Sequence, residues 1–281
     1  MNFTQQIEAF SPHLPETEDR YLKLAKTAAL QAGKLQLESF GKSIKIQTKN
    51  TAIDLVTRVD TECDALITQI LRQGCPHDNI LTEEQFQEGQ AVSLENTWVV
   101  DPLDGTTNYA HGFPQFAVSI AYFWQGVPHL GVIYDPIKQE MFYSMRKRGA
   151  FLNDTPIFVS GNRVHALSSA LLATGFPYDI ATCPNNNMNH FQRIAPLCQG
   201  VRRPGAAALD MAYVACGRLD GFWELKLSLW DIAAGIPLVE EAGGTVTALD
   251  GGILPYTDRK IHLVASNGNG LHTELLTQLA L

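Results

Sequence analysis

Residues 98–107 read Trp-Val-Val-Asp-Pro-Leu-Asp-Gly-Thr-Thr, a stretch that combines a strand, a turn and the start of a helix. Its first three residues are apolar, as is typical of a buried strand, and they lead directly to Asp101. The proline and the glycine that follow favour a turn, and the Gly-Thr-Thr segment is expected to open a short helix. The turn therefore brings two carboxylates, those of Asp101 and Asp104, to one side of the chain.

Two carboxylates on one tight turn repel each other. Unit charges roughly 4 Å apart cost about 4 kcal/mol at an effective dielectric near 20. Either one carboxyl is protonated or a cation lies between them. Oxygen ligands without a nearby histidine favour Mg²⁺ over zinc, and the amides that begin the helix at Thr106 favour an anion. The stretch as a whole therefore indicates phosphoryl transfer to water, whereas an Asp-Gly pair alone would indicate only a capped turn.

Three further carboxylates lie at positions where an acidic side chain is common for structural reasons alone. Glu83 belongs to a Glu-Glu pair after a short apolar stretch, which by itself reads as a solvated pair. Asp231 follows a tryptophan at an expected helix start, where aspartate commonly caps. Asp60 lies in the first turn of another expected helix, a favourable place for any carboxylate. Only together with the 98–107 turn do these residues indicate a metal site.

The remaining pattern mixes helices and strands. We expect an α+β fold of layered sheets, forming a single domain over residues 1–281, rather than one doubly wound sheet. Pro237 lies inside one of the expected helices, so we expect a kink there or a later helix start. Residues 42–53 are polar and basic and read as a loop or an exposed hairpin. The expected helices cover 16–40, 57–71, 187–197, 206–216, 230–242 and the C-terminal end, and the expected strands cover 98–100, 116–124, 127–134, 141–145, 170–174, 220–225, 245–249 and 261–265.

Composition excludes several functional classes. The 281 residues carry a net charge of −8, from 21 basic and 29 acidic side chains, so neither nucleic acid nor an anionic membrane is an expected partner. No apolar run is long enough to span a membrane, and residues 1–15 do not read as a signal peptide. The five cysteines are scattered and without CxxC spacing, which is typical of reduced thiols and predicts a cytoplasmic location.

Other catalytic patterns are absent from the sequence. There is no GxSxG, HExxH, Walker A or GxGxxG motif. The haloacid-dehalogenase pattern needs aspartates two residues apart, and Asp101 and Asp104 are three apart. Cys198 lies near two arginines, but the spacing is one residue short of a cysteine-phosphatase loop. A metal-assisted reaction therefore remains the prediction from the residues alone.

Taken together, these residues resemble the inositol monophosphatase family, which belongs with fructose 1,6-bisphosphatase to a superfamily of lithium-sensitive phosphatases. The resemblance extends from about Tyr21 to about Asn267. It implies a layered αβαβα sandwich, a homodimer and inhibition by lithium. The stretches that carry it are Asp54-Leu-Val-Thr-Arg-Val-Asp60, Leu81-Thr-Glu-Glu84, Trp98 to Asn108, Arg202-Arg-Pro-Gly-Ala-Ala-Ala208, Gly221-Phe-Trp-Glu224, and Trp230-Asp-Ile-Ala-Ala-Gly235 through Glu241-Ala-Gly-Gly244.

The resemblance also implies a set of metal ligands for two or three Mg²⁺ ions. Glu83, Asp101 and the Leu103 carbonyl match the ligands of a first ion. Asp101, Asp104 and Asp231 match those of a second, and Glu83 borders a third, weaker position.

The remaining roles follow from the same resemblance. Thr106 paired with Asp60 matches the group that orients and activates the attacking water. The amides of Gly105 and Thr106 match a phosphate cradle, and Lys49 matches a loop lysine near the metals. The positions that match contacts to the inositol ring are Asp104, Ala207 and Glu224.

The chain departs from the family pattern mainly where the alcohol part of the substrate is expected. Ala206 stands where a serine or threonine is common, and Lys226 lies in a stretch where many members have a glycine. The resemblance nevertheless implies hydrolysis of inositol monophosphate, a small phosphorylated polyol. Fructose 1,6-bisphosphate, histidinol phosphate or a 3′-phosphonucleotide remain alternatives, since Arg202, Arg203 and Lys226 could meet a second phosphate. A regulatory homologue without turnover is a further alternative, disfavoured by the complete ligand set.

Overall fold

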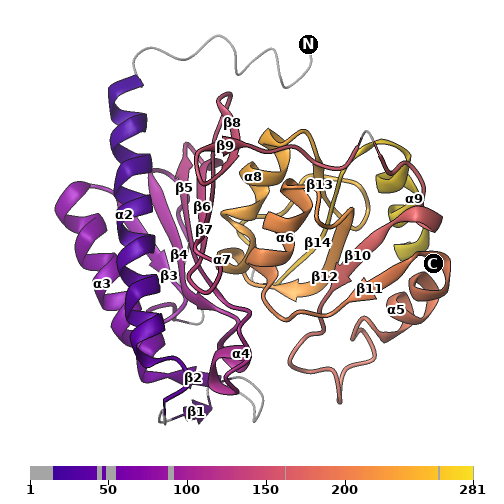
Figure 1. The fold of residues 1–281 in the computed structure, drawn as a ribbon, viewed down its shortest axis with the longest axis horizontal. Coiled ribbons are helices and arrows are strands. Elements are labelled where there is room, and N and C mark those ends of the chain that lie inside the picture. The colour runs from indigo at the N-terminus through magenta and orange to yellow at the C-terminus, as the bar shows by residue number, and fades with distance from the viewer. Residues whose placement is uncertain are drawn as a thin grey trace.

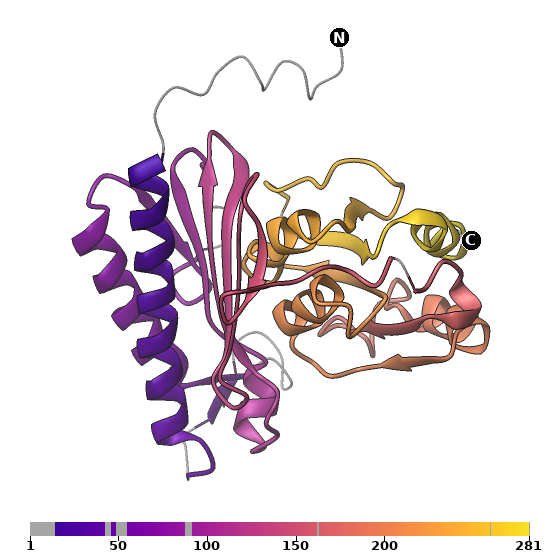
Figure 2. The same cartoon turned by 45° about the horizontal axis from the view of Figure 1, so that its top comes forward.

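The structure is a computed structural model that describes residues 15–42, 46–48, 55–87, 92–161, 163–258 and 260–280. Helices and sheets alternate in layers, as Figures 1 and 2 show. Helices α2 (Pro15–Ser39) and α3 (Arg58–Gly74) cover one face of a seven-stranded sheet. Helices α6 (Ala207–Ala215) and α8 (Gly235–Glu241) lie between this sheet and a five-stranded one. Helix α9 (Asn269–Leu279) packs on the far side, so the predicted αβαβα order is confirmed.

The seven-stranded sheet is antiparallel except at its first pair. Strands β3 and β4 run parallel, and every later neighbour in the order β3-β4-β5-β6-β7-β8-β9 is antiparallel. The predicted strands near 98–145 are all present, and β4 and β7 are longer than expected. The bounds are β3 (Asn79–Thr82), β4 (Thr97–Asp104), β5 (Ala117–Trp124), β6 (Val127–Asp135), β7 (Glu140–Met145), β8 (Gly149–Leu152) and β9 (Thr155–Pro156).

The five-stranded sheet is mixed. Its order is β11-β10-β12-β14-β13, with β10 parallel to both neighbours and β14 antiparallel to both of its own. A separate antiparallel pair joins β1, which lies within the stretch 42–53 predicted to be a loop or an exposed hairpin, to β2, which follows that stretch. The bounds are β1 (Ile46–Thr48), β2 (Leu55–Thr57), β10 (Leu171–Thr174), β11 (Gly200–Arg202), β12 (Gly221–Leu227), β13 (Thr245–Ala248) and β14 (Ile261–Ser266).

Each of two stretches predicted to form one helix is divided in the structure, so both single-helix predictions are wrong. Residues 230–242 form α7 (Leu229–Ile232) and α8, which begins later, at Gly235. Pro237 then lies in the first turn of α8, where a missing amide hydrogen costs no hydrogen bond. Residues 187–197 form α5 (Met188–Ile194) followed by a 3₁₀ turn that contains a proline. The predicted short helix after the Asp101 turn is present as α4 (Thr106–Ala110).

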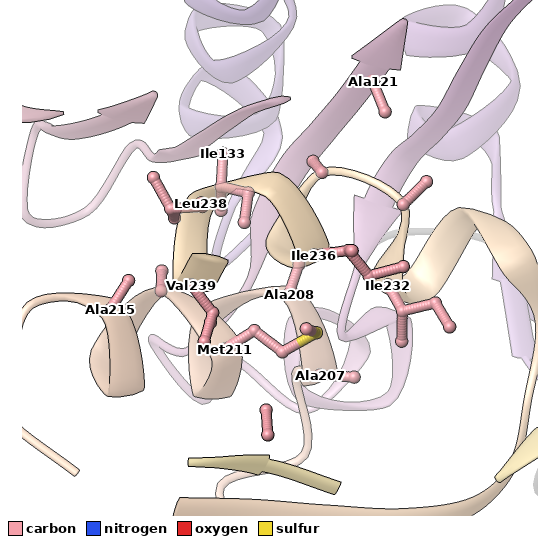
Figure 3. Close-up of a cluster of buried hydrophobic side chains, with 14 of the residues drawn as sticks. Ala121, Ile133, Ala207, Ala208, Met211, Ala215, Ile232, Ile236, Leu238 and Val239 are labelled. Carbon is pink, nitrogen blue, oxygen red and sulfur yellow. The ribbon is translucent and has the colours of Figure 1, made fainter. Parts of the chain in front are cut away.

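Side-chain alternation divides the apolar residues of the seven-stranded sheet between two cores. In β4, Trp98 and Val100 face α2 and α3, whereas Val99 faces the helices between the sheets. Figure 3 shows the second core, in which Ile133 of β6 meets Leu238 of α8. A third core packs α9 on the five-stranded sheet. Within the described residues, no helix has the length and apolar character needed to cross a membrane.

The backbones of β6 and of the α7–α8 break lie in direct contact. A Cβ added at Gly131 would lie 2.2 Å from the carbonyl oxygen of Ala234 and 3.0 Å from its Cα. Both obstacles are backbone, so rotation of a side chain cannot relieve the overlap. Gly131 therefore sets how closely α7, which carries Asp231, approaches the sheet that carries Asp101.

Substituting Gly131 tests this contact. We expect Gly131→Ala to lower the free energy of unfolding by about 2 kcal/mol or more, because overpacking against backbone forces the layers apart. Urea unfolding monitored by circular dichroism measures the change. The control is Gly252→Ala, an exposed position whose added Cβ would meet only the flexible side chain of Asp250. Equal stability of the two variants would contradict the role of Gly131.

Candidate active site

The end of β4 holds Asp101 and Asp104 on a short irregular turn. The β4–β5 register shifts between these two residues: Asp101 pairs with Ser119 and Asp104 with Ala117, and the residues between them leave the regular ladder. The Leu103 amide donates to Asp101 Oδ1 at 2.9 Å, and the two aspartates are 2% and 7% exposed. Gly105 ends the turn with φ +92°, and a Cβ there would lie 2.9 Å from the carbonyl oxygen of Gln115. Only glycine fits that conformation and that space, which explains the Asp-Gly pair.

The second layer of helices reaches the same turn through α6. The backbone amide of Ala208 donates to Asp104 Oδ2 at 2.9 Å, so a residue distant in sequence caps the start of α6. Asn108 strengthens the junction, because its Nδ2 donates to the carbonyl oxygens of Gln115 and Pro204, each at 2.8 Å. The two halves of the molecule therefore meet at the Asp101 turn. Asn108 has a positioning role that the sequence did not reveal.

The predicted pairing of Thr106 with Asp60 is present. Thr106 Oγ1 lies 3.0 Å from Asp60 Oδ1 and 3.1 Å from the carbonyl oxygen of Leu103. Asp60 is itself held at the start of α3, where Thr57 donates to its Oδ2 from the backbone amide at 2.9 Å and from the hydroxyl at 2.5 Å. When the Thr106 hydroxyl donates to Asp60, its oxygen lone pairs are left to accept a hydrogen bond from water.

Glu83 and Asp231 approach the turn from either side. The Glu83 amide donates to the carbonyl oxygen of Val100 at 3.1 Å, which continues the β3–β4 pairing up to Asp101. Asp231 lies in α7, and its Oδ2 accepts from the Ser228 amide at 2.7 Å. Both roles expected for Asp231, a cap and a member of the cluster, are compatible, because the cap uses only one carboxylate oxygen.

Asp101 and Asp104 lie close enough to the neighbouring carboxylates for their pKa values to be raised. Burial raises the pKa of Asp101 well above its usual value, and Glu83, Asp104 and Asp231 raise it further. Burial also raises the pKa of Asp104, with Asp231 as the next contributor, although hydrogen bonds from backbone amides partly oppose the shift. In the part of the chain described here, neither aspartate forms an ion pair with a lysine or arginine. Among the described residues, these two aspartates therefore have no lysine or arginine partner to neutralise their charge.

This donor set suits a hard divalent cation. It consists of carboxylate oxygens and the Leu103 carbonyl, the ligands that Mg²⁺ accepts. The described residues contain no group of three His, Cys, Asp or Glu side chains already gathered around a common point. Asp101, Asp104 and Asp231 each turn one carboxylate oxygen toward a backbone amide. The ligand assignment therefore remains a prediction that the chemistry of the donors supports.

Glu224 and Ala207, the residues expected at the alcohol side, border the same cluster. Desolvation, with Asp231 nearby, raises the pKa of Glu224 to about 8, while Arg203 opposes the shift. Ala207 begins α6 beside the amide that holds Asp104. Asp210, which the sequence analysis did not select, is 1% exposed, and its pKa is raised by burial and then by Glu224. The available signal was a single acidic residue within the otherwise apolar stretch of α6.

Every predicted site residue that the structure describes therefore belongs to one connected region. Hydrogen bonds join Asp60, Thr106 and Leu103, and electrostatic interactions join Glu83, Asp101, Asp104, Asp231 and Glu224. Lys49 lies outside the described residues, so its expected place near the metals stays a prediction.

The raised pKa of Asp101 predicts a dependence of stability on pH. A carboxyl whose pKa is higher in the folded state favours folding at low pH, and this contribution is lost as the pH rises above the ordinary value of 3.8. Asp101→Asn removes the buried charge but keeps an acceptor for the Leu103 amide. With chelator present near pH 8, we expect the free energy of unfolding of this variant to exceed that of wild type by about 1 kcal/mol or more. Near pH 4 the difference should be smaller.

Thermal unfolding across this pH range provides the measurement. Asp250→Asn, at an exposed aspartate that also accepts from a backbone amide, is the control and should change little at either pH. A constant difference between Asp101→Asn and wild type from low to high pH would contradict the proposed repulsion.

Comparison with known proteins agrees with this geometry. The profile of the inositol monophosphatase family matches residues 17–280. An inositol-1-monophosphatase from Synechocystis sp. is 44% identical over 275 residues, which are 98% of this chain and 93% of that relative. A Nus factor SuhB from Pseudomonas aeruginosa is 44% identical over 251 residues, 88% of this chain and 91% of that relative. A solved inositol monophosphatase from Anabaena (Nostoc) sp. is 41% identical with a TM-score of 0.82, covering 94% of this chain and 96% of that one. The chain therefore belongs to the inositol monophosphatase family, and its enzyme class is that of a phosphatase.

Proposed function

We propose that this protein is a Mg²⁺-dependent phosphomonoesterase that hydrolyses inositol monophosphate to myo-inositol and phosphate. The observation that carries the proposal is the Thr106–Asp60 hydrogen bond beside the buried cluster of Asp101, Asp104 and Asp231. A polarised hydroxyl next to carboxylates that need a cation is the arrangement that attack by water on a phosphate ester requires. The similarity to an inositol-1-monophosphatase over nearly the whole chain supports the choice of substrate.

Within this proposal, one Mg²⁺ would be held by Glu83, Asp101 and the Leu103 carbonyl. A second would be held by Asp101, Asp104 and Asp231, and a third, more weakly bound Mg²⁺ would lie near Glu83. When bound, Mg²⁺ supplies positive charge for the phosphate oxygens and lowers the pKa of water.

The chain's own groups then orient the reactants. The Thr106 hydroxyl donates to Asp60 and accepts a hydrogen bond from the attacking water, which places the water for in-line displacement. The backbone amides of Gly105 and Thr106, at the start of α4, face the phosphate. Asp60, held by Thr57, keeps the hydroxyl in this orientation. We assign Lys49, which lies outside the described residues, to the place near the metals that the family resemblance implies.

The alcohol side determines the substrate. We assign the contacts with the inositol hydroxyls to Asp104, Ala207 and Glu224. With a pKa of about 8, Glu224 can donate as well as accept a hydrogen bond at neutral pH, which suits a polyol. Arg203 lies close enough to lower the pKa of Glu224, so a second phosphate on the alcohol is the competing possibility.

A substrate panel separates these possibilities. We expect inositol 1-phosphate to have the highest kcat/KM in a set with fructose 1,6-bisphosphate, histidinol phosphate and 3′-phosphoadenosine 5′-phosphate. A higher value for fructose 1,6-bisphosphate or the nucleotide would replace inositol monophosphate as the substrate and assign Arg203 to the second phosphate.

Removing the metal tests the cofactor and separates catalysis from a purely regulatory role. In excess EDTA we expect phosphate release to stop, because no described cation neutralises Asp101 and Asp104, and added Mg²⁺ should restore it. Phosphate release measured by a colorimetric assay provides the readout. Turnover that persists in EDTA would contradict the metal proposal. No turnover of any panel member with Mg²⁺ would favour a regulatory homologue, a possibility that the SuhB relative keeps open.

Substituting Thr106 tests the assignment of water activation. We expect Thr106→Ala to lower kcat by about a hundredfold or more, because the hydroxyl that orients the water is lost. Mg²⁺ affinity, measured by calorimetry, should change little, because the hydroxyl is not an assigned ligand. Thr106→Ser, which keeps the hydroxyl, is the matched control and should retain most of the activity. Unchanged kcat in Thr106→Ala would remove this residue from the mechanism.

We further propose that the chain acts as a single domain over residues 1–281, forms a homodimer, works in the cytoplasm and is inhibited by lithium. Five free cysteines support a reducing compartment. The net charge of −8 supports a small anionic substrate held through Mg²⁺, with neither nucleic acid nor membrane as a partner.

A further inference from the structure

Lys226 occupies a backbone conformation that favours glycine. Its φ is +61°, at a bulge in β12 directly after Glu224. The bulge is held in place because the Lys226 amide donates to Nδ1 of His262 on the neighbouring strand β14, at 3.1 Å. A non-glycine residue in this region is strained, so its side chain needs an interaction that explains its presence.

The side chain of Lys226 provides such an interaction. Its Nζ donates to Asp179 Oδ2 at 2.6 Å and to Cys183 Sγ at 3.0 Å. The lysine side chain is 17% exposed, so it spans the surface with its charge largely covered. Both partners lie in the segment 175–187, which connects β10 to α5. Lys226 therefore joins the strand of Glu224 to this segment.

The two ends of the segment are fastened around Glu224 as well. A Cβ added at Gly175 would lie 2.2 Å from both carboxylate oxygens of Glu224, so the segment begins in contact with that carboxylate. At the other end, Asn187 is 2% exposed and donates to the carbonyl oxygen of Gly175 at 2.6 Å. Trp223 Nε1 donates to Asn187 Oδ1 at 2.8 Å. Trp223 and Lys226, on either side of Glu224, thus hold the segment at its base and at its middle.

We propose that Lys226 is a positioning residue that fastens segment 175–187 beside Glu224 and thereby determines affinity for the alcohol part of the substrate. The Asn187 interactions are buried and hold the base of the segment, whereas the bonds to Asp179 and Cys183 hold its outer part. Loss of Lys226 frees only the outer part. The effect on substrate affinity rests on the proposed function, because it acts through Glu224. The fastening of the segment by Lys226 does not depend on that function.

The left-handed conformation of Lys226 allows a clean test. Lys226→Gly removes the side chain while relieving the backbone, so the variant should fold and its melting temperature should not fall. Lys147→Gly is the matched control, because Lys147 is exposed, has φ +64° and lies in the turn between β7 and β8 of the other sheet. Lys226→Arg, which can still reach Asp179, is the conservative rescue.

Hydrogen exchange measures the fastening without reference to activity. We expect amides of residues 178–184 to exchange about tenfold faster in Lys226→Gly than in wild type, since two charge-assisted contacts are lost. They should exchange at the wild-type rate in Lys147→Gly. Unchanged exchange in Lys226→Gly would overturn the fastening.

Kinetics test the consequence for the substrate. We expect Lys226→Gly to raise KM for inositol 1-phosphate about fivefold to tenfold with kcat nearly unchanged, and Lys226→Arg to recover much of the loss. The inhibition constant of inorganic phosphate, which lacks the alcohol part, should not change. An unchanged KM, or an equal rise in the phosphate inhibition constant, would overturn the specificity role.

Failure of the proposed function would have a different signature. If wild type hydrolyses another member of the substrate panel instead, the same KM comparison applies to that ester. If wild type hydrolyses none of them, the proposed function and the specificity role fail together, and the exchange measurement still decides whether Lys226 fastens the segment.

Discussion

Mutual repulsion among buried carboxylates is the constraint on which the site depends. Asp101 and Asp104 are almost fully buried at the end of a strand, with Glu83 and Asp231 near enough to raise the pKa of one or both. The fold tolerates this charge because each aspartate in the group directs one oxygen to a backbone amide. Those amides belong to β4, α6 and the start of α7, so the seven-stranded sheet and the helices between the sheets have to be in place before the cluster exists. We propose that the same repulsion gives the cluster its affinity for a cation.

The layered architecture also explains why site residues are scattered along the sequence. Asp60 begins a helix on the outer face of the seven-stranded sheet, Asp101 ends a strand of that sheet, and Asp231 lies in α7 near the break that packs on Gly131. Each residue has a local structural use as a cap or a turn. The same hydrogen bonds that cap the elements also orient the carboxylates, so fold and site share their interactions.

Local patterns in the sequence predicted much of this, and their limits have physical causes. The strand, turn and short helix around Asp101 were predicted because an apolar run, proline and glycine act locally. A kink or a later helix start was expected from Pro237, and the later start is present, but the position of the α7–α8 break depends on the close approach of β6, which no local pattern contains. Strands β3 and β11 and the β8–β9 hairpin were not predicted. They are short and take their stability from neighbouring strands. Asn108 and Asp210 were not selected, since their partners are distant in sequence, and the fastening by Lys226 depends on a bulge that only the β12–β14 register reveals.

In the proposed function, metal chemistry and substrate selection occupy different parts of one region. We assign the carboxylates around Asp101 to the metal chemistry, and Glu224 with segment 175–187 to substrate selection. The central claim, that the buried cluster is a divalent-cation site, is tested most directly by a crystal structure of the protein soaked in Mn²⁺, using anomalous scattering. The account predicts a peak about 2.0–2.3 Å from carboxylate oxygens of Asp101, with a second peak shared with Asp104 and Asp231. Active crystals that show no anomalous peak at Asp101 would contradict it.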